Sequence, residues 1–272
     1  MAVMSKRPTL PIALTIAGSD SGGGAGLQAD LKTFAALGVH GTSAVTCLTA
    51  QNPRGVRALE AVRARLVLQQ IEAVFEELHP AAVKTGLLYS AEIIRVVVKF
   101  FRGGERPPLI VDPVMVATSG QRLLQPAAVK ALQRDLLPLA ALVTPNLPEA
   151  EILLGHALRS LADLRAAARE IHARYGCAAL VKGGHLRGGR EAVDFFYDGQ
   201  TELLLSAPFV KGIKTHGTGC TYSAAIAAHL ARGCTLPGAV EKAKQFVSLA
   251  IGESRRAAGH PVLNWFGATP LR

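Results

Sequence analysis

The 272-residue sequence contains few cysteines and few aromatic residues. None of its four cysteines, Cys47, Cys177, Cys220 and Cys234, forms a CxxC pair or a His/Cys cluster with the spacing of a zinc site. This pattern argues against a disulfide-stabilised secreted protein and favours the reducing cytoplasm. Aromatic residues make up only 5% of the chain, so the net charge of +10 does not predict a nucleic-acid surface on which bases stack. An anionic small ligand suits the basic balance equally well.

Long apolar runs and a P-loop are also missing. No apolar run is long enough to cross a membrane as a helix, so we expect no membrane partner. Because aromatic residues are scarce, we also expect no nucleic-acid partner. The first apolar run follows Lys6 and Arg7, as in a signal peptide, but it is short and ends at Gly18; we expect a buried strand at 12–17 instead. The pattern G-x-x-x-x-G-K-[ST] is absent, which excludes a P-loop nucleotide site in its usual form.

Short apolar segments rich in Val, Ile and Thr alternate with segments of helical periodicity. Such short segments are typical of strands that are covered on both faces. They are "IALTIAG", "TSAVTCLTAQ", "AAVKTG", "LIVDPV", "ALVTPN", "AALVKGG", "AVDFFYDG" and "TELLLSAPFV". Helical patterns occupy 63–78 and 160–176, and we expect the last third to be helical over 221–232 and 237–258.

This alternation predicts one α/β domain, residues 1–272, with a mostly parallel central sheet and helices on both faces. Asp198-Gly199 lies between two strand patterns and predicts a hairpin, and therefore a short antiparallel edge. In sheets of this kind, ligands bind beyond the carboxyl ends of the strands. The polar residues at strand ends are therefore the candidates for a functional site.

The first strand pattern runs into a glycine-rich loop, "GSDSGGGAGLQADLKTF". Gly24 to Ala29 satisfies the dinucleotide pattern G-x-G-x-x-G/A, but the second strand ends in "AQN" and offers no acidic residue for a ribose. A nicotinamide cofactor is therefore disfavoured. The glycines exceed what a tight turn needs, which favours a close approach of the backbone to a ligand over a purely structural turn.

Polar residues at three further strand ends suit phosphate chemistry, and each has a simpler structural role. Asn146 and Glu149 can hold the hydration shell of a magnesium ion, but on spacing alone a helix cap at Asn146 is favoured. Lys182 can meet a phosphate as a point charge or lie solvated at the end of its strand. Asp112 can serve as a magnesium or catalytic carboxylate or form an Asp-Pro turn.

The segment "KTHGTGCTYSAAIAAHL" places a glycine turn and Cys220 at the start of a helix. The N–H groups at Gly217, Thr218 and Gly219 and the helix dipole are expected to form an anion site. The same dipole is expected to lower the pKa of the Cys220 thiol. A glycine turn beside a half-buried structural cysteine is the competing interpretation. Together with the strand-end residues, the segment favours phosphoryl transfer to a hydroxyl group.

The sequence resembles the hydroxymethylpyrimidine/phosphomethylpyrimidine kinases of thiamine biosynthesis, within the ribokinase-like superfamily. The resemblance extends from about Ile12 to the last helix. It rests on "ALTIAGSDSGGGAGLQADLKTFAALG", "TAQNPRGV", "VKTGLL", "VDPVM", "VTPNLPEAEILLG", "VKGGH" and "THGTGCTYSAAIAAHL". It implies a three-layer ribokinase-like fold, usually a homodimer. It also implies ATP- and magnesium-dependent phosphorylation of 4-amino-5-hydroxymethyl-2-methylpyrimidine and then of its monophosphate.

The resemblance also implies roles for individual residues. The pyrimidine is expected to contact Gln51, Gly18, Asp30 and Val114, and the nucleotide phosphates to contact Lys182, Asn146 and Asp112. Glu149 and Asn146 are expected to hold magnesium, and Gly217, Thr218, Gly219 and Cys220 to form the anion hole and the catalytic base. Two alternatives remain: a pyridoxal kinase, and a pyrimidine-binding sensor without catalysis. The amide of Gln51 offers one donor and one acceptor, which matches an aminopyrimidine.

Overall fold

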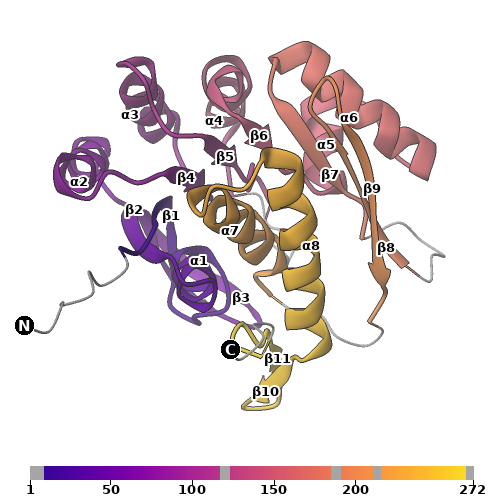
Figure 1. Ribbon diagram of the computed structural model, residues 1–272. Helices are drawn as coiled ribbons and strands as arrows, with labels where there is room; N and C mark the ends of the chain where they lie inside the picture. Colours follow the sequence, from indigo (N-terminus) through magenta and orange to yellow (C-terminus); the bar gives the residue numbers. More distant parts are fainter. Residues whose placement is uncertain (1–8, 117–122, 185–190, 211–215, 268–272) are drawn as a thin grey trace, which may run out of the picture.

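A nine-stranded sheet forms the centre of the computed structural model, which describes residues 9–116, 123–184, 191–210 and 216–267 (Figure 1). Its strand order is β3-β2-β1-β4-β5-β6-β7-β8-β9. The strands are β1 (Ile12–Asp20), β2 (His40–Asn52), β3 (Gly55–Ala61), β4 (Ala82–Thr85), β5 (Leu109–Val111), β6 (Leu142–Val143), β7 (Ala178–Lys182), β8 (Glu191–Tyr197) and β9 (Glu202–Pro208). Neighbouring strands from β2 to β7 pair in parallel, as expected from the short apolar segments.

Both edges of the sheet are antiparallel hairpins. The hairpin predicted at Asp198-Gly199 is confirmed, because β8 and β9 pair antiparallel around it. The opposite hairpin, formed by β2 and β3, was not expected. β3 is mostly exposed and carries Arg57 and Glu60. It therefore lacks the apolar run by which the inner strands can be recognised.

Alternate residues of each inner strand face two separate apolar clusters. Leu14 and Ile16 of β1 pack on one face with α2 to α6, while Ala13 packs on the other with α1, α7 and α8. These helices are α1 (Gly26–Ala36), α2 (Ala64–Glu77), α3 (Ala91–Arg102), α4 (Pro126–Ala131), α5 (Leu147–Leu154), α6 (Leu161–Tyr175), α7 (Thr218–Ala231) and α8 (Leu236–Gly252). The turns η1 (Leu132–Leu136) and η2 (Leu137–Leu139) follow α4. The expected layers of helix, sheet and helix are confirmed.

Local signals at helix ends are reproduced in the structure. Ser160 and Asp163 form a capping box at the start of α6, and Gly176 ends it in the left-handed conformation at φ 75°. α2 lies within the predicted range 63–78. In each case the sequence pattern and the local backbone agree.

The C-terminal helix ends earlier than predicted. We expected helix through Ala258, but α8 ends at Gly252 and a hairpin of β10 (Arg255–Ala257) and β11 (His260–Val262) follows. The turn between them uses positive φ at Ala258 and Gly259. The hairpin reverses the chain, and the indole N–H of Trp265 then donates to the Thr221 hydroxyl over 3.0 Å. The chain after α8 therefore packs Trp265 on α7 where further helical turns were expected.

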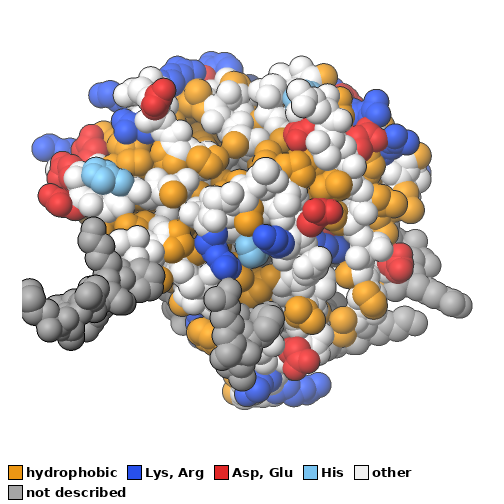
Figure 2. Space-filling view, viewed as in Figure 1, with side chains coloured by type: hydrophobic (Ala, Val, Ile, Leu, Met, Phe, Trp, Pro, Cys, Tyr) orange, Lys and Arg blue, Asp and Glu red, His pale blue; other side chains and the backbone are white. Residues whose placement is uncertain are grey.

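The described surface is mixed in charge. Lys and Arg side chains are spread over the face shown in Figure 2 and form no continuous stripe on it. Among the helices of the described ranges, none combines the length and the hydropathy needed to cross a bilayer.

Candidate active site

A cavity lies beyond the carboxyl ends of the parallel strands, where the sequence analysis placed the functional site. Most of the predicted site residues line it: Gly18, Gln51, Asp112, Val114, Asn146, Glu149, Lys182, Gly217, Gly219 and Cys220. Thr218, the first residue of α7, is not among the described lining residues. His185 and Thr215, which belong to the segments quoted for the resemblance, lie outside the described residues.

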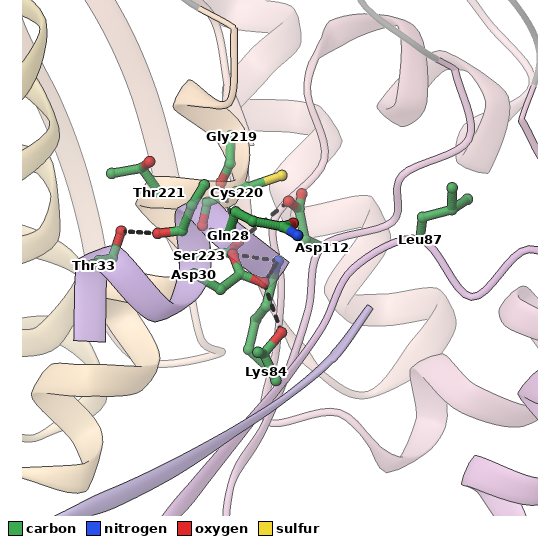
Figure 3. Close-up of polar contacts among 12 residues, drawn as sticks. Gln28, Asp30, Thr33, Lys84, Leu87, Asp112, Gly219, Cys220, Thr221 and Ser223 are labelled. Carbon is green, nitrogen blue, oxygen red and sulfur yellow. Dashed lines mark hydrogen bonds and ion pairs between the residues drawn. The ribbon is translucent and has the colours of Figure 1, made fainter. Parts of the chain in front are cut away.

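Asp30 does not line the cavity, which corrects the prediction that it contacts the pyrimidine. Its side chain is fully buried, and its two carboxylate oxygens accept hydrogen bonds from the Lys84 ammonium at 2.9 and 2.7 Å (Figure 3). The Thr15 hydroxyl donates to the same carboxylate at 2.6 Å. Lys84 itself lines the cavity. Asp30 therefore lies behind the wall and acts on the site through Lys84.

Lys84 is a site residue that the sequence analysis missed. Burial alone lowers the pKa of Lys84, but Asp30, a negative charge on Cys220 and Asp112 raise it above its usual value, so the ammonium keeps its charge. A signal was present in the sequence, because "AAVKTG" places a lysine within an otherwise apolar buried strand. Lysine is rarely buried without an ionic partner.

The thiol of Cys220 lies at the cavity wall in the first turn of α7, but its pKa moves opposite to the prediction. Burial raises the pKa of Cys220 to about 11, and the carboxylates of Asp30 and Asp112 add to this, whereas Lys84 acts in the other direction. A helix dipole contributes only about 0.3–1 kcal/mol at most sites, which is less than the cost of burying a thiolate. At neutral pH the free protein therefore holds a protonated thiol.

The glycine-rich loop packs against the turn that precedes α7. Gly217 has φ +85°, and a Cβ added there would lie 1.8 Å from the Gly24 carbonyl oxygen. Gly26 has φ +54°, and a Cβ there would lie 2.4 Å from the Gly18 carbonyl oxygen. At these positions the close approach is between protein backbones, and it brings the first turns of α1 and α7 to one cavity. For Gly26 the backbone of Gly18 accounts for the glycine, and the expected approach of the rest of the glycine-rich loop to a ligand stays a prediction.

Lys182 and Asp112 form an ion pair at the first turn of α7. The ammonium lies 3.2 Å from one Asp112 oxygen, and the Ser223 hydroxyl of α7 donates to the other oxygen at 3.2 Å. A Cβ added at Gly219 would lie 3.3 Å from Lys182 Nζ, so glycine gives the ammonium its space. Burial lowers the pKa of Lys182, but Asp112 and Glu149 raise it overall. The cavity thus combines a charged lysine with a helix N-terminus.

Asn146 and Glu149 form the capping box of α5, the role that the spacing favoured. The Asn146 side chain accepts from the Glu149 N–H at 3.0 Å, and the Glu149 carboxylate accepts from the Asn146 N–H at 2.9 Å. Burial raises the pKa of Glu149 to about 7, opposed by Lys182 and reinforced by Asp112. Both cap residues still line the cavity, so capping and ligand binding are compatible.

The residues present fit a magnesium ion that keeps most of its water. In the described residues, no group of three or more His, Cys, Asp or Glu side chains could hold a metal on its own. Mg²⁺ usually retains several waters and binds one or two carboxylates together with substrate phosphates. Asp112 lies close enough to Glu149 to raise the pKa of Glu149, and a cation between the two carboxylates would relieve that repulsion.

Asp20 and His216 are two further cavity residues that the sequence analysis did not select. Asp20 accepts from the N–H groups of Gly22 and Ala25 at 2.8 Å each. Burial raises the pKa of Asp20, but hydrogen bonds from His216, Ala25 and Gly22 bring it below its usual value. His216 Nε2 lies 2.6 Å from the amide nitrogen of Gln51. The two residues are distant in sequence from Gln51, so no local pattern marks this contact.

Comparison with known proteins identifies close relatives. The family model described as phosphomethylpyrimidine kinase matches residues 20–263. A protein of Rhizobium meliloti (strain 1021), named hydroxymethylpyrimidine/phosphomethylpyrimidine kinase, is 53% identical over 247 residues, which cover 90% of this chain and 92% of that protein. The structure of phosphomethylpyrimidine kinase from Clostridium difficile 630 matches with 42% identity and a TM-score of 0.78, over 88% and 99% of the two chains. An ADP complex of Bacillus subtilis pyridoxal kinase matches with 36% identity and a TM-score of 0.88, over 95% and 98%.

Proposed function

Since this chain belongs to the phosphomethylpyrimidine kinase family, we propose that it acts twice in thiamine biosynthesis, with ATP as phosphate donor. It phosphorylates first the hydroxymethyl group of 4-amino-5-hydroxymethyl-2-methylpyrimidine and then the resulting monophosphate. One observation carries this proposal: the Lys182 ammonium, paired with Asp112, lies beside Gly219 in the first turn of α7. Phosphoryl transfer depends mainly on such positioning and charge neutralisation.

Lys182, Asp112 and Asn146 are the residues proposed to hold the nucleotide phosphates. Lys182 supplies a positive charge, and the N–H groups at Gly217 to Gly219 supply neutral donors that point out of the helix N-terminus. When bound, ATP and magnesium supply the transferable phosphoryl group and neutralise its charge. Glu149 and Asn146 are proposed to orient the water shell of that ion, which agrees with the small number of acidic ligands nearby.

Cys220 is proposed to face the acceptor hydroxyl. Its thiol lies in the same helical turn as the anion-binding N–H groups, and Lys84 is the nearby positive charge that stabilises a thiolate. Because the free protein keeps a proton on this sulfur, Cys220 is proposed to lose that proton to solvent first. As a thiolate it then takes the hydroxyl proton in the first phosphorylation, while the bond from the hydroxyl oxygen to phosphorus forms and the bond to the leaving ADP breaks. Thr218 and Gly219 belong to the same anion hole in this proposal.

The pyrimidine ring is proposed to lie against Gly18, Val114 and Gln51, all of which line the cavity. Gln51 contacts the amino group and the adjacent ring nitrogen through its carboxamide. Asp30 contributes only through the ion pair with Lys84. In this proposal the pyrimidine lies at the Gln51 end of the cavity and the phosphates lie near Lys182.

A coupled ATPase assay with magnesium tests this function against the alternatives. The protein is offered the hydroxymethylpyrimidine, its monophosphate and pyridoxal, each separately. Turnover of the first two supports the proposal. Turnover of pyridoxal alone would show a kinase whose substrate is pyridoxal, which is consistent with the match to a pyridoxal kinase structure. Binding of the pyrimidine without any turnover would indicate a sensor. We also propose a homodimer, which analytical ultracentrifugation would test.

A further inference from the structure

His216 Nε2 contacts two cavity side chains, one of which favours a lone pair on this nitrogen and the other a proton. The amide nitrogen of Gln51 lies at 2.6 Å and needs an acceptor. The carboxylate oxygen Oδ2 of Asp20 lies at 3.3 Å and can only accept, so it favours a proton on the same nitrogen. A neutral imidazole nitrogen serves as donor or as acceptor, not as both. The hydrogen-bonding state of His216 is therefore linked to the orientation of the Gln51 amide.

The other contacts of Asp20 and the two distances from His216 Nε2 favour the contact with Gln51. The oxygen of Asp20 that faces His216 already accepts backbone N–H bonds from Gly24 at 3.1 Å and Ala25 at 2.8 Å. The contact to Gln51 is shorter than the contact to Asp20 by 0.7 Å, the difference between 3.3 and 2.6 Å. This oxygen of Asp20 keeps two backbone donors without His216, so His216 Nε2 can turn its lone pair to Gln51, although a proton on that nitrogen would also stabilise the Asp20 carboxylate.

His216 is also the main contact that fixes the amide. Among the described residues, the other side chain near the amide head is Thr49, whose hydroxyl lies 3.4 Å from the Gln51 oxygen. That hydroxyl donates instead to the Ser19 carbonyl over 2.9 Å, so it does not select one amide orientation. The ring of His216 lies beside Gly24, where an added Cβ would lie 3.2 Å from Cδ2, so glycine leaves the ring its space.

We propose that His216 is a positioning residue that sets the orientation of the Gln51 amide and thereby the preference of this site for an aminopyrimidine. This inference rests on the proposed function. With one amide hydrogen donated to His216, Gln51 keeps its carbonyl oxygen and its second N–H for the ring. An amino group beside a ring nitrogen matches that pair. The 4-oxo analogue of the same ring presents the reverse pair, an acceptor oxygen beside a ring N–H, and matches only the rotated amide.

The test is a calorimetric titration of the wild type and His216→Phe with the amino substrate and with its 4-oxo analogue. We expect the wild type to prefer the amino compound by at least about tenfold, because the wrong analogue leaves buried polar groups unpaired. In His216→Phe the amide is free to rotate, so the preference should fall to within about threefold. Among the described residues, the side chains that hydrogen-bond to the Gln51 amide are those of His216 and Thr49, so His260→Phe removes a histidine outside this set and should keep the wild-type preference. If His216→Phe does not fold, His216→Leu carries the same expectation.

A double-mutant cycle separates this role from a general structural one. In a Gln51→Leu background, His216→Phe should change affinity by less than about twofold, because its effect acts through the amide. An equal effect in both backgrounds, or an unchanged preference in His216→Phe, would overturn the inference. Phosphorylation of the amino compound by the wild type is measured alongside. Its absence would refute the proposed function, whereas its presence with an unchanged preference in His216→Phe would refute only the role of His216.

Discussion

The ammonium of Lys84 and the thiol of Cys220 are electrostatically coupled across the cavity wall. The ammonium lowers the pKa of the thiol, and a negative charge on the thiol raises the pKa of Lys84. Burial nevertheless determines the net result, because the pKa of Cys220 rises to about 11. The charge that would stabilise a thiolate is thus already in place, while the free protein keeps the proton on sulfur.

Alkylation kinetics test the protonation state of Cys220. Because only the thiolate is alkylated, the rate at Cys220 should keep rising with pH up to about 11, without a plateau near neutrality. The measurement is the rate of iodoacetamide modification of the Cys220 peptide by mass spectrometry, with the partly exposed Cys234 in the same digest as a reference for reagent activity. A plateau between pH 7 and 8 would show that the helix dipole dominates after all.

The ion pair of Lys84 and Asp30 should show strong coupling in stability. Both side chains are fully buried, so Lys84→Met leaves an unpaired buried carboxylate and should cost about 3–5 kcal/mol in the free energy of unfolding. The double variant Lys84→Met/Asp30→Leu removes both charges and should be more stable than either single variant. Urea denaturation of the four proteins measures this. Additive losses would contradict the coupling.

The inner strands of the fold could be predicted because burial on both faces leaves a continuous apolar run in the sequence. β3 and the hairpin of β10 and β11 leave no such run, since their side chains are exposed or only partly buried. The end of α8 was misplaced for a tertiary reason. After the hairpin, Trp265 is buried and donates to Thr221, and that contact joins residues far apart in sequence, so no local pattern marks it.

The candidate site could be predicted where residues follow strands or begin a helix, because parallel strands bring their carboxyl ends to one edge. Asn146, Lys182 and Cys220 are of this kind. The direction in which the pKa of Cys220 shifts could not be predicted, since it depends on how deeply the thiol is buried. Neither could the position of the Asp30 side chain in α1, which pairs with Lys84 of β4, nor the contact between Gln51 and His216.

His229 should make the protein less stable in acid. Burial lowers the pKa of His229 to about 4, with the nearby Arg232 and Lys242 acting in the same direction. Because the unfolded chain binds this proton near pH 6.5 and the folded protein does not, stability should be lost as pH falls from about 6.5 to 4. His229→Gln should flatten the slope of the unfolding free energy over that window. An identical slope in both proteins would show that other groups account for the pH dependence.

Gln51→Leu should weaken pyrimidine binding by about 1–3 kcal/mol, because the amino group and ring nitrogen of the ligand lose their partner. ATP affinity should change little, since Gln51 lies at the end of β2, away from Lys182 at the end of β7. Calorimetric titrations with each ligand measure both effects. Unchanged pyrimidine affinity would remove Gln51 from the binding site.

Cys220 should matter more for the first phosphorylation than for the second. The first acceptor is a hydroxyl that must lose a proton, and removal of a general base typically lowers kcat by roughly 10²–10⁴-fold. The second acceptor is a phosphate whose second pKa is about 6, so it is already ionised at neutral pH and needs no base. Cys220→Ala should therefore reduce the first step by that range and the second by less than about tenfold.

Cys220→Asp distinguishes a base from a packing residue. If Cys220 takes the proton, an aspartate at this position can do so too, and the first step should be fastest in the wild type, slower with Asp and slowest with Ala. If the thiol only packs against its neighbours, a buried carboxylate at this position lowers stability and does not increase kcat, so Cys220→Asp would be less stable and less active than Cys220→Ala. The measurement is kcat for both steps in the three proteins, with Tm values to exclude unfolding. Substrate affinity should be nearly equal in all three, because a base acts mainly in the transition state. Equal losses in the two steps would place Cys220 in the anion hole that both phosphorylations share, since each transfer develops charge on the same phosphoryl oxygens.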